Sequence, residues 1–151
     1  MLAKAEHLKL YSLDEAEAAL PKGEEVLFMG WLMAGHISGI DQAVRQWKVK
    51  AACGVGMSPA GAEVMATMAK ANYVPNAPLF YLQGGWAPQK VGWFQRRMVG
   101  MVTRSIRKTL REKGNRRTEQ EQAYYDMMVR GGSFVAYQNL KPIQDWLAGQ
   151  R

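Results

Sequence analysis

Glycines and a histidine follow an apolar run near the start of the chain, in a pattern that could make room for a ligand. The run VLFM leads into Gly30 and Trp31, and Gly35 and His36 follow shortly afterwards. Glycine lets the backbone approach a flat or phosphorylated ligand closely, and a histidine can donate to a ligand or assist proton transfer. The alternatives are that the glycines only form turns and that His36 is a partly exposed loop residue.

Two further apolar runs end in the same way, at Gly54/Gly56 and at Gly84/Gly85. The runs at 25–31, 49–56 and 78–85 predict buried strands, and the segments 37–48 and 58–72 have helical spacing between them. A short strand is also expected over 7–13. This alternation favours an α/β fold with a mostly parallel sheet, in which ligands bind at the carboxyl ends of the strands.

Familiar catalytic and metal-binding motifs are absent from the sequence. There is no P-loop, no GxGxxG fingerprint, no C-x-x-C, no H-E-x-x-H and no G-x-S-x-G. The two histidines, His7 and His36, are too far apart in sequence to suggest a metal site. The single cysteine, Cys53, lies in an apolar run and is expected to be a buried structural thiol. A length of 151 residues predicts one domain, 1–151.

The excess of positive charge lies entirely in the second half of the chain. Residues 1–75 hold 7 Lys/Arg and 8 Asp/Glu, whereas residues 76–151 hold 13 and 5. The segment 88–113 is expected to form one long basic amphipathic helix. Its apolar stripe consists of Phe94, Met98, Met101, Val102, Ile106 and Leu110, and its basic face of Arg96, Arg97, Arg104, Arg107, Lys108 and Arg111.

This helix, which Trp93 and Phe94 open, has several readings. It could lie on an anionic membrane surface or bind an acidic partner, or its stripe could pack on a core while its basic face is simply solvated. Nucleic-acid binding is disfavoured, because the aromatic residues are grouped at Trp93 and Phe94 instead of alternating with the basic ones. We expect a cytoplasmic protein, with peripheral contact at the inner face of the membrane as one option.

Four segments, taken in order, resemble flavodoxin-like proteins. They are EEVLFMGWLMAGHISGIDQAV, ACGVGMSPAG, FYLQGGWAPQKVGWFQRRMVGMVTRSIRK and FVAYQNLKPIQDWL. The resemblance runs from about residue 8 to residue 147 and is nearest to the branch that includes menaquinone-dependent protoporphyrinogen dehydrogenase. It implies a flavodoxin-like three-layer sandwich with FMN at the carboxyl edge of the sheet. It also implies a redox partner protein or a quinone- or porphyrinogen-type substrate, and a role for 93–113 in membrane association or substrate access.

Carried over to this sequence, the resemblance places the flavin ring between the loops 30–39 and 54–61. Trp31 would flank the ring and His36 would lie near it. The cofactor-binding residues implied are Gly30, Trp31, Leu32, Gly35, His36, Gly54, Val55, Gly56 and Met57. No catalytic residue is assigned. The redox chemistry would belong to the cofactor, and the protein would bind and tune it.

The sequence departs from the family at its start. The first family strand and the S-x-T-G-x-T loop that holds the FMN phosphate have no counterpart. Because that strand is central in the family, its loss would leave two unpaired edges beside a gap. Three explanations stay open: a fragment or misassigned start, re-pairing of HLKLY beside VLFMG, or a second chain that fills the gap in a homodimer. Two functions are expected. The first is an FMN-dependent redox protein that acts in electron transfer or as an oxidoreductase similar to protoporphyrinogen dehydrogenase. The second is a non-flavin interaction module on a degenerate flavodoxin fold.

Overall fold

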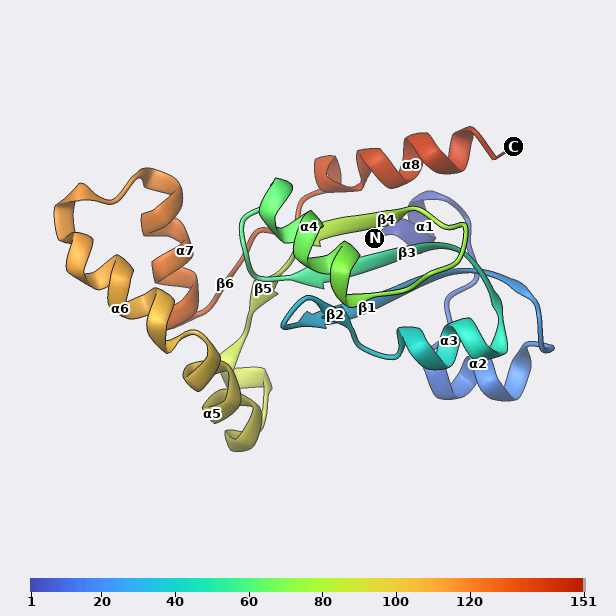
Figure 1. Cartoon of the computed structure of the whole chain (residues 1–151), viewed down its shortest axis with the longest axis horizontal. Helices are drawn as coiled ribbons and strands as arrows, with labels where there is room; N and C mark the ends of the chain where they lie inside the picture. The colour runs from blue at the N-terminus through green and yellow to red at the C-terminus, as the bar shows by residue number, and fades with distance from the viewer. Residues whose placement is uncertain (151) are drawn as a thin grey trace. The chain divides into compact units, whose positions relative to one another are not determined.

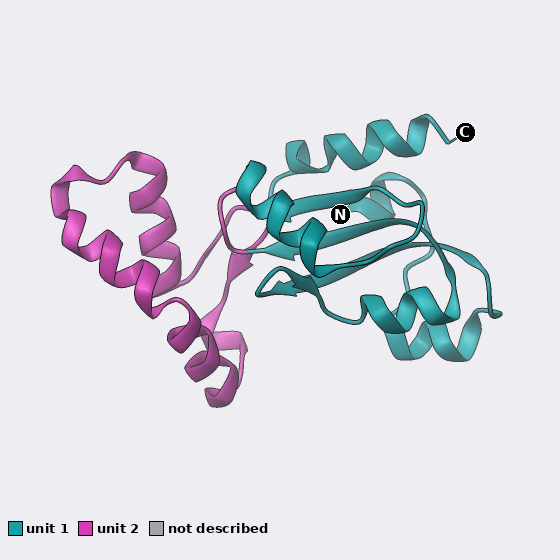
Figure 2. Cartoon of the chain, viewed as in Figure 1, with its two compact units in different colours: residues 1–56, 60–83, 135–151 teal, residues 57–59, 84–134 magenta. Residues whose placement is uncertain are grey.

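The computed structural model describes residues 1–150 and divides into two compact units. Unit 1 comprises residues 1–56, 60–83 and 135–150, and unit 2 comprises residues 57–59 and 84–134 (Figure 2). Most of unit 2 is inserted into the sequence of unit 1, so the two are not consecutive domains. One flavodoxin-like domain over residues 1–151 stays a prediction. The units are described separately below.

Unit 1 is built on a four-stranded, mostly parallel sheet. Its order is β2-β1-β3-β4, where β1 is Glu25–Met33, β2 is His36–Ile37, β3 is Lys48–Gly56 and β4 is Leu79–Gln83 (Figure 1). β3 pairs in parallel with both β1 and β4, and β2 returns antiparallel along the end of β1. The prediction of an α/β fold with a mostly parallel sheet is confirmed, but of the three strands expected to be buried only β3 is, since β1 contains no fully buried residue and β4 only one.

β3 is central because its residues are apolar on both faces. Ala51, Ala52 and Cys53 are almost completely buried, which is how a run without alternation behaves when both sides of a strand are covered. Ala52 belongs to one hydrophobic cluster and Cys53 to another. The consecutive residues therefore point into the two cores that lie on opposite sides of the sheet.

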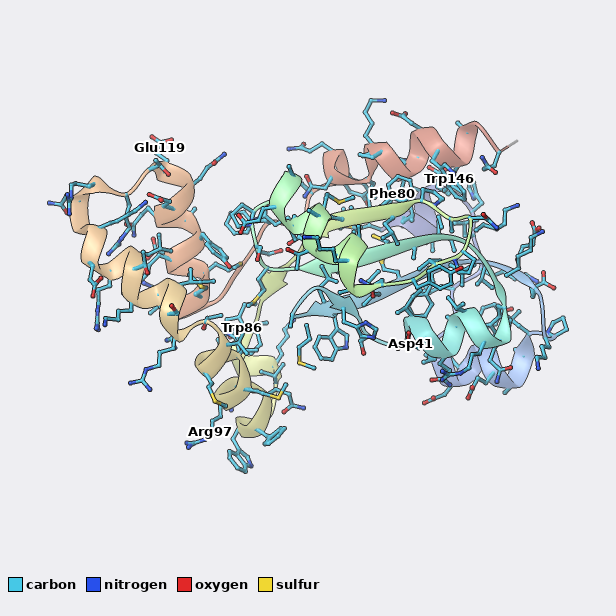
Figure 3. All side chains as sticks on the ribbon, viewed as in Figure 1. Asp41, Phe80, Trp86, Arg97, Glu119 and Trp146 are labelled. Atoms are coloured by element: carbon cyan, nitrogen blue, oxygen red, sulfur yellow. The ribbon has the colours of Figure 1, made fainter. Side chains whose placement is uncertain are left out.

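Helices supply the outer layers of both cores. In the first core, Ile40, Ala43 and Met68 meet Ala52 of the sheet. In the second, Ile143 meets Cys53, and Trp146 packs against Phe80 with ring centroids 6.1 Å apart (Figure 3). The result is a three-layer arrangement. The first face is covered by α2 (Leu13–Ala19), α3 (Ile40–Gln46) and α4 (Ala62–Ala71), and the second by α1 (Leu2–Ala5), the 3-10 turn η3 (Tyr137–Leu140) and α8 (Lys141–Ala148).

The expected strand over 7–13 is wrong. Residues 6–12 form a turn and irregular chain, His7 has a φ of 54°, and the Leu10 side chain is 82% exposed. Two leucines alternate there, but no neighbouring strand offers a ladder. HLKLY therefore does not re-pair with VLFMG, and the sheet contains no internal gap. Instead β1 is an edge strand over most of its length, since within residues 1–150 its outer side meets β2 only at Leu32 and Met33.

Unit 2 is mainly helical. Leu110, Tyr124, Met127 and Met128 form its buried core, and Met57 packs against it. Thr118 and Glu121 form a capping box at the start of its last helix, α7. Its elements are β5 (Gly85–Trp86), η1 (Pro88–Lys90), α5 (Trp93–Val102), α6 (Arg104–Lys113), η2 (Gly114–Arg116), α7 (Glu119–Arg130) and β6 (Gly132–Ser133).

The single long helix expected over 88–113 is also wrong, because the chain breaks at Thr103 between α5 and α6. The Thr103 hydroxyl donates to the Val99 carbonyl at 2.7 Å, a back-bond that bends helices. Gly100 further weakens the helix, and the Arg107 guanidinium donates to the Gly100 carbonyl at 2.7 Å. The predicted stripe is therefore split: Leu110 of α6 is buried, whereas no residue of α5 is.

Candidate functional site

The glycines assigned to the ligand loops lie mostly within strands. β1 extends to Met33 and β3 to Gly56, and His36 begins β2, so seven of the nine candidate cofactor residues belong to the sheet. The parallel register aligns Gly30 with Gly54 and Trp31 with Val55. These four residues are brought together at the carboxyl ends of neighbouring strands, where the sequence predicted a site.

The space beside these glycines is filled by the protein itself. A Cβ on Gly30 would lie 2.5 Å from the Ser38 carbonyl oxygen. One on Gly54 would lie 2.6 Å from the Met68 sulfur, and one on Gly56 would lie 2.9 Å from the Tyr81 hydroxyl. Each glycine is thus explained by close packing within unit 1. None of these three positions offers an empty cradle for a ligand.

Gly35 shapes a tight hairpin between β1 and β2. Ala34 and Gly35 both have positive φ, 52° and 86°, as the two-residue hairpin turn of type I′ requires. The buried side chain of Asn72, at the end of α4, holds this hairpin. Its amide donates to the Gly35 carbonyl at 2.8 Å and its oxygen accepts from the Ile37 N–H at 2.8 Å.

Asn72 also donates to the Met68 carbonyl at 2.7 Å, so its side-chain amide is fully engaged in structure. Asn72 is not among the residues predicted for this site from the sequence. The only local indication of its role is that it is the last residue of the predicted helical segment 58–72, where asparagine is common.

His36 is tied to two helices of unit 1. Its Nδ1 lies 3.2 Å from the Ala71 carbonyl oxygen, and its Nε2 lies 3.2 Å from an Asp41 carboxylate oxygen. Both neighbours are acceptors, and a neutral imidazole with one N–H can satisfy only one of them. These contacts give His36 a bridging role between the end of α4 and the first turn of α3, at a partly exposed position.

The remaining candidate residues point in different directions. Leu32 packs in the first core of unit 1 and Val55 in the second, while Met57 packs in the core of unit 2. Trp31 is 54% exposed, and Met29 and Met33 on the same side of β1 are also exposed. An apolar stripe of alternate residues therefore lies along the open edge strand.

The residues present in this chain do not fit FMN by themselves. Trp31 could flank a flat ring, but Gly30, Gly54 and Gly56 face the protein's own atoms. The sequence has no S-x-T-G-x-T loop for the phosphate. Burial raises the pKa of the adjacent Cys53 thiol to about 12, so it is not a thiolate nucleophile near neutral pH.

The second candidate surface lies on α5 in unit 2. Trp93 and Phe94 are 72% and 60% exposed, and their rings touch edge to face with centroids 6.0 Å apart. Met101 and Val102 are exposed as well. Arg96 and Arg97 are exposed on the same helix, and Arg97 extends away from its ribbon (Figure 3). This helix therefore presents apolar and cationic side chains to solvent.

The other four predicted basic residues lie on α6. Arg104, Arg107, Lys108 and Arg111 line a groove beside α7. The break at Thr103 assigns them to a different helix from Arg96 and Arg97. The predicted basic face is therefore divided between two helices.

Neither a spanning helix nor a metal cluster is found among residues 1–150. No helix in that range combines the length and the apolar character needed to cross a bilayer. No group of three His, Cys, Asp or Glu side chains there is placed to hold a metal ion.

Comparison with known proteins gives no relative for this chain. No protein-family model, curated protein or solved structure matches it. Membership of a flavodoxin-like family therefore stays a prediction.

Proposed function

We propose that this chain is an interaction module on a flavodoxin-like framework and that it docks on an anionic membrane surface through α5. The observation that carries the proposal is the exposure of Trp93, Phe94, Met101 and Val102 on one helix. Single exposed apolar side chains are common, whereas a contiguous cluster of them marks an interaction site. The parallel order β1-β3-β4 supports the flavodoxin-like framework.

The arginines of α5 indicate that the surface it binds is anionic. Arg96 and Arg97 accompany the apolar residues of α5, and the sequence contains no Asp or Glu between Glu63 and Glu112. A helix with Trp and Phe on one side and arginines beside them is typical of segments that lie in the membrane interface. An acidic protein would satisfy the arginines but gives no particular reason for four exposed apolar side chains. A lipid surface satisfies both.

Vesicle binding tests this proposal. Wild-type protein should co-sediment with vesicles that contain phosphatidylglycerol and much less with vesicles of phosphatidylcholine alone, and binding should weaken as salt is added. Trp93→Ala/Phe94→Ala should lower the affinity by about tenfold or more, since each ring contributes up to about 1.5–3 kcal/mol when buried. Arg96→Gln/Arg97→Gln should cost about 1 kcal/mol per charge.

Matched variants control for general effects. Tyr73→Ala/Tyr137→Ala removes two aromatic rings that are equally exposed but lie in unit 1, and Lys9→Gln/Lys22→Gln removes two exposed charges there. Both should bind vesicles like the wild type. If all four variants lose binding equally, or if no binding occurs at low salt, α5 is not a membrane-docking helix, and an acidic protein partner becomes the reading to test.

A second candidate function is FMN-dependent redox chemistry with a quinone- or porphyrinogen-type substrate. The observation that favours it is the exposed Trp31 at the carboxyl end of a parallel strand. Because residues 1–150 do not fit FMN by themselves, this function needs a further part that completes the site, and a second chain is one such part. A homodimer, or a redox partner protein, would pair with the open edge of β1 and cover Met29, Trp31 and Met33.

Absorbance separates the two functions. Purified protein that carries flavin bands near stoichiometric occupancy supports the redox function. A colourless protein that takes up no added FMN, whether as a monomer or as a dimer, removes that function for this chain. The vesicle assay does not depend on flavin, so the docking proposal stands or falls independently.

A further inference from the structure

A groove between α6 and α7 of unit 2 concentrates positive charge. Its volume is about 600 Å³, within the range of small-molecule sites. α7 contributes Tyr125 and Val129 to its lining, and α6 contributes Arg104, Arg107, Lys108 and Arg111. The α6 residues follow the spacing i, i+3, i+4 and i+7, which brings them to one face of the helix.

The charges in this groove are poorly compensated. Like charges three and four residues apart on a helix repel one another. Lys108 has a carboxylate within reach, Glu112 at 3.9 Å. Within residues 1–150, no carboxylate forms an ion pair with Arg104, Arg107 or Arg111. Of the acids of α7, Glu121 pairs with Lys113, and Asp126 lies 3.2 Å from Arg130, although its covered Oδ1 accepts no hydrogen bond within residues 1–150.

Arg107 also has a buried hydrogen-bond donor that lacks an acceptor. Its Nη2 donates to the Gly100 carbonyl, but its Nε is covered by protein and has no acceptor. A covered donor without an acceptor costs about 1–3 kcal/mol. An anion beside Arg107 would offset part of that cost through its charge.

The wall that α7 provides is held in a fixed position. The Arg117 guanidinium lies over the Tyr125 ring, 4.2 Å from its centroid. Arg117 also donates to the Gln122 side chain at 2.7 Å and to the Leu110 carbonyl. Arg117 therefore holds the Tyr125 ring from one side, and the groove has an aromatic wall opposite a basic one.

We infer that this groove binds a phosphate group. Arginine and lysine side chains donate hydrogen bonds and accept none, so the ligand must carry several acceptors and negative charge. A phosphate monoester carries a charge near −2 and oxygens whose geometry matches the arginine fork. The inference does not depend on membrane docking, because it concerns α6 and α7 and leaves out α5. The phosphate comes either from a soluble phosphorylated compound or from a lipid headgroup.

The test measures inorganic phosphate and pyrophosphate binding by calorimetry at constant ionic strength, with chloride and acetate as reference anions. Pyrophosphate should bind more tightly than phosphate, and both more tightly than acetate. Arg104→Gln/Arg111→Gln should weaken pyrophosphate binding about tenfold or more, since the ligand loses two charge-assisted donors. Neither arginine forms an ion pair within residues 1–150, so the variant should fold.

Two further variants make the result specific. Arg96→Gln/Arg97→Gln removes the same charge from α5 and should change pyrophosphate binding by no more than about twofold. Arg104→Lys/Arg111→Lys keeps the charge but loses the fork, and should bind with intermediate affinity. Equal losses in the α5 and α6 double variants would show diffuse attraction only and would overturn the inference, as would acetate binding as tightly as phosphate.

Vesicles that contain phosphatidic acid, a phosphomonoester lipid, identify the source. If pyrophosphate binds and competes with these vesicles for Arg104 and Arg111, the site accepts the phosphate group from either source. If only the vesicles bind, and Arg104→Gln/Arg111→Gln abolishes their preference over phosphatidylglycerol, the ligand is a lipid headgroup. If neither probe depends on the two arginines, the groove is not a phosphate site.

Discussion

Gly30→Ala separates the two explanations for the glycines of the candidate flavin site. If Gly30 makes room for a ligand, the free protein should tolerate a methyl group there. If it makes room for the protein, the free protein should lose stability. The added Cβ would lie 2.5 Å from the Ser38 carbonyl oxygen and 2.8 Å from Ile37 Cγ2. A backbone oxygen cannot rotate away, and Ile37 is completely buried.

The expected loss follows from these contacts. Overpacking of a tight site costs about 1–3 kcal/mol, and a clash with backbone belongs at the upper end. Replacing glycine by alanine in a strand returns about 0.5–1 kcal/mol through chain entropy. The net loss should be about 2 kcal/mol, which corresponds to about 4–8 °C in Tm for a chain of this length. Urea unfolding without added flavin measures it directly.

Gly149→Ala is the matched control. Its nearest neighbours would lie 3.5 Å and 3.7 Å from the new Cβ, and its φ of −74° suits alanine. It should leave stability unchanged or raise it by up to about 1 kcal/mol. Equal stability of Gly30→Ala and Gly149→Ala would refute the packing explanation. Loss of FMN uptake by Gly30→Ala at wild-type stability would restore the ligand explanation.

Two other predictions concern buried groups of unit 1. Asn72→Ala should destabilise the protein by about 2–3 kcal/mol and accelerate hydrogen exchange at the Ile37 amide, because a buried N–H loses its acceptor. Asn72→Asp keeps an acceptor and should protect that amide better than Asn72→Ala does. Unchanged exchange in Asn72→Ala would contradict the assignment of Asn72 as the residue that holds the β1–β2 hairpin. Burial raises the pKa of Cys53 from 9.0 to about 12, so the unfolded chain loses this proton first and stability should fall as the pH rises from 9 toward 12. The wild type should lose up to about 1.4 kcal/mol per pH unit more than Cys53→Ala in urea unfolding above about pH 9; parallel pH profiles of the two proteins would contradict the assignment.

The parallel sheet was predictable because its signal is local and redundant. Ala51, Ala52 and Cys53 lie in an uninterrupted apolar run between segments of helical spacing, and such a run suits a strand that is covered on both sides. The capping box at Thr118 and Glu121 is a local feature of the same kind, since the two side chains bond to backbone only three residues away.

The errors arose where the outcome depends on distant residues. Leu8 and Leu10 alternate as in a strand, but a strand also needs a neighbour to pair with, and the sequence does not show that residues 6–12 pair with no strand of the sheet. Thr103 is an ordinary helix residue until its hydroxyl bonds to the Val99 carbonyl. The stripe across 88–113 could therefore be read from spacing, but its division into two helices could not.

The candidate site shows the same limit. That glycines follow three apolar runs is visible in the sequence, whereas the atoms that fill the space beside them are not. Met68 lies 14 residues from Gly54, and only the folded chain shows that its sulfur occupies the missing side chain's place. Asn72 was missed because its partners, Gly35 and Ile37, are more than thirty residues away.

The short ladder at the base of unit 2 has a consequence for how the chain can vary. β5 and β6 pair antiparallel, with Gly85 opposite Ser133 and Trp86 opposite Gly132, and the Phe134 N–H donates to the Gly84 carbonyl at 3.0 Å. The two ends of the inserted segment therefore lie about 5 Å apart. A turn of two residues could join them in place of everything between. The segment that carries α5, α6 and α7 is thus an insertion. Its length and charge can vary without any change in the distance between its two ends.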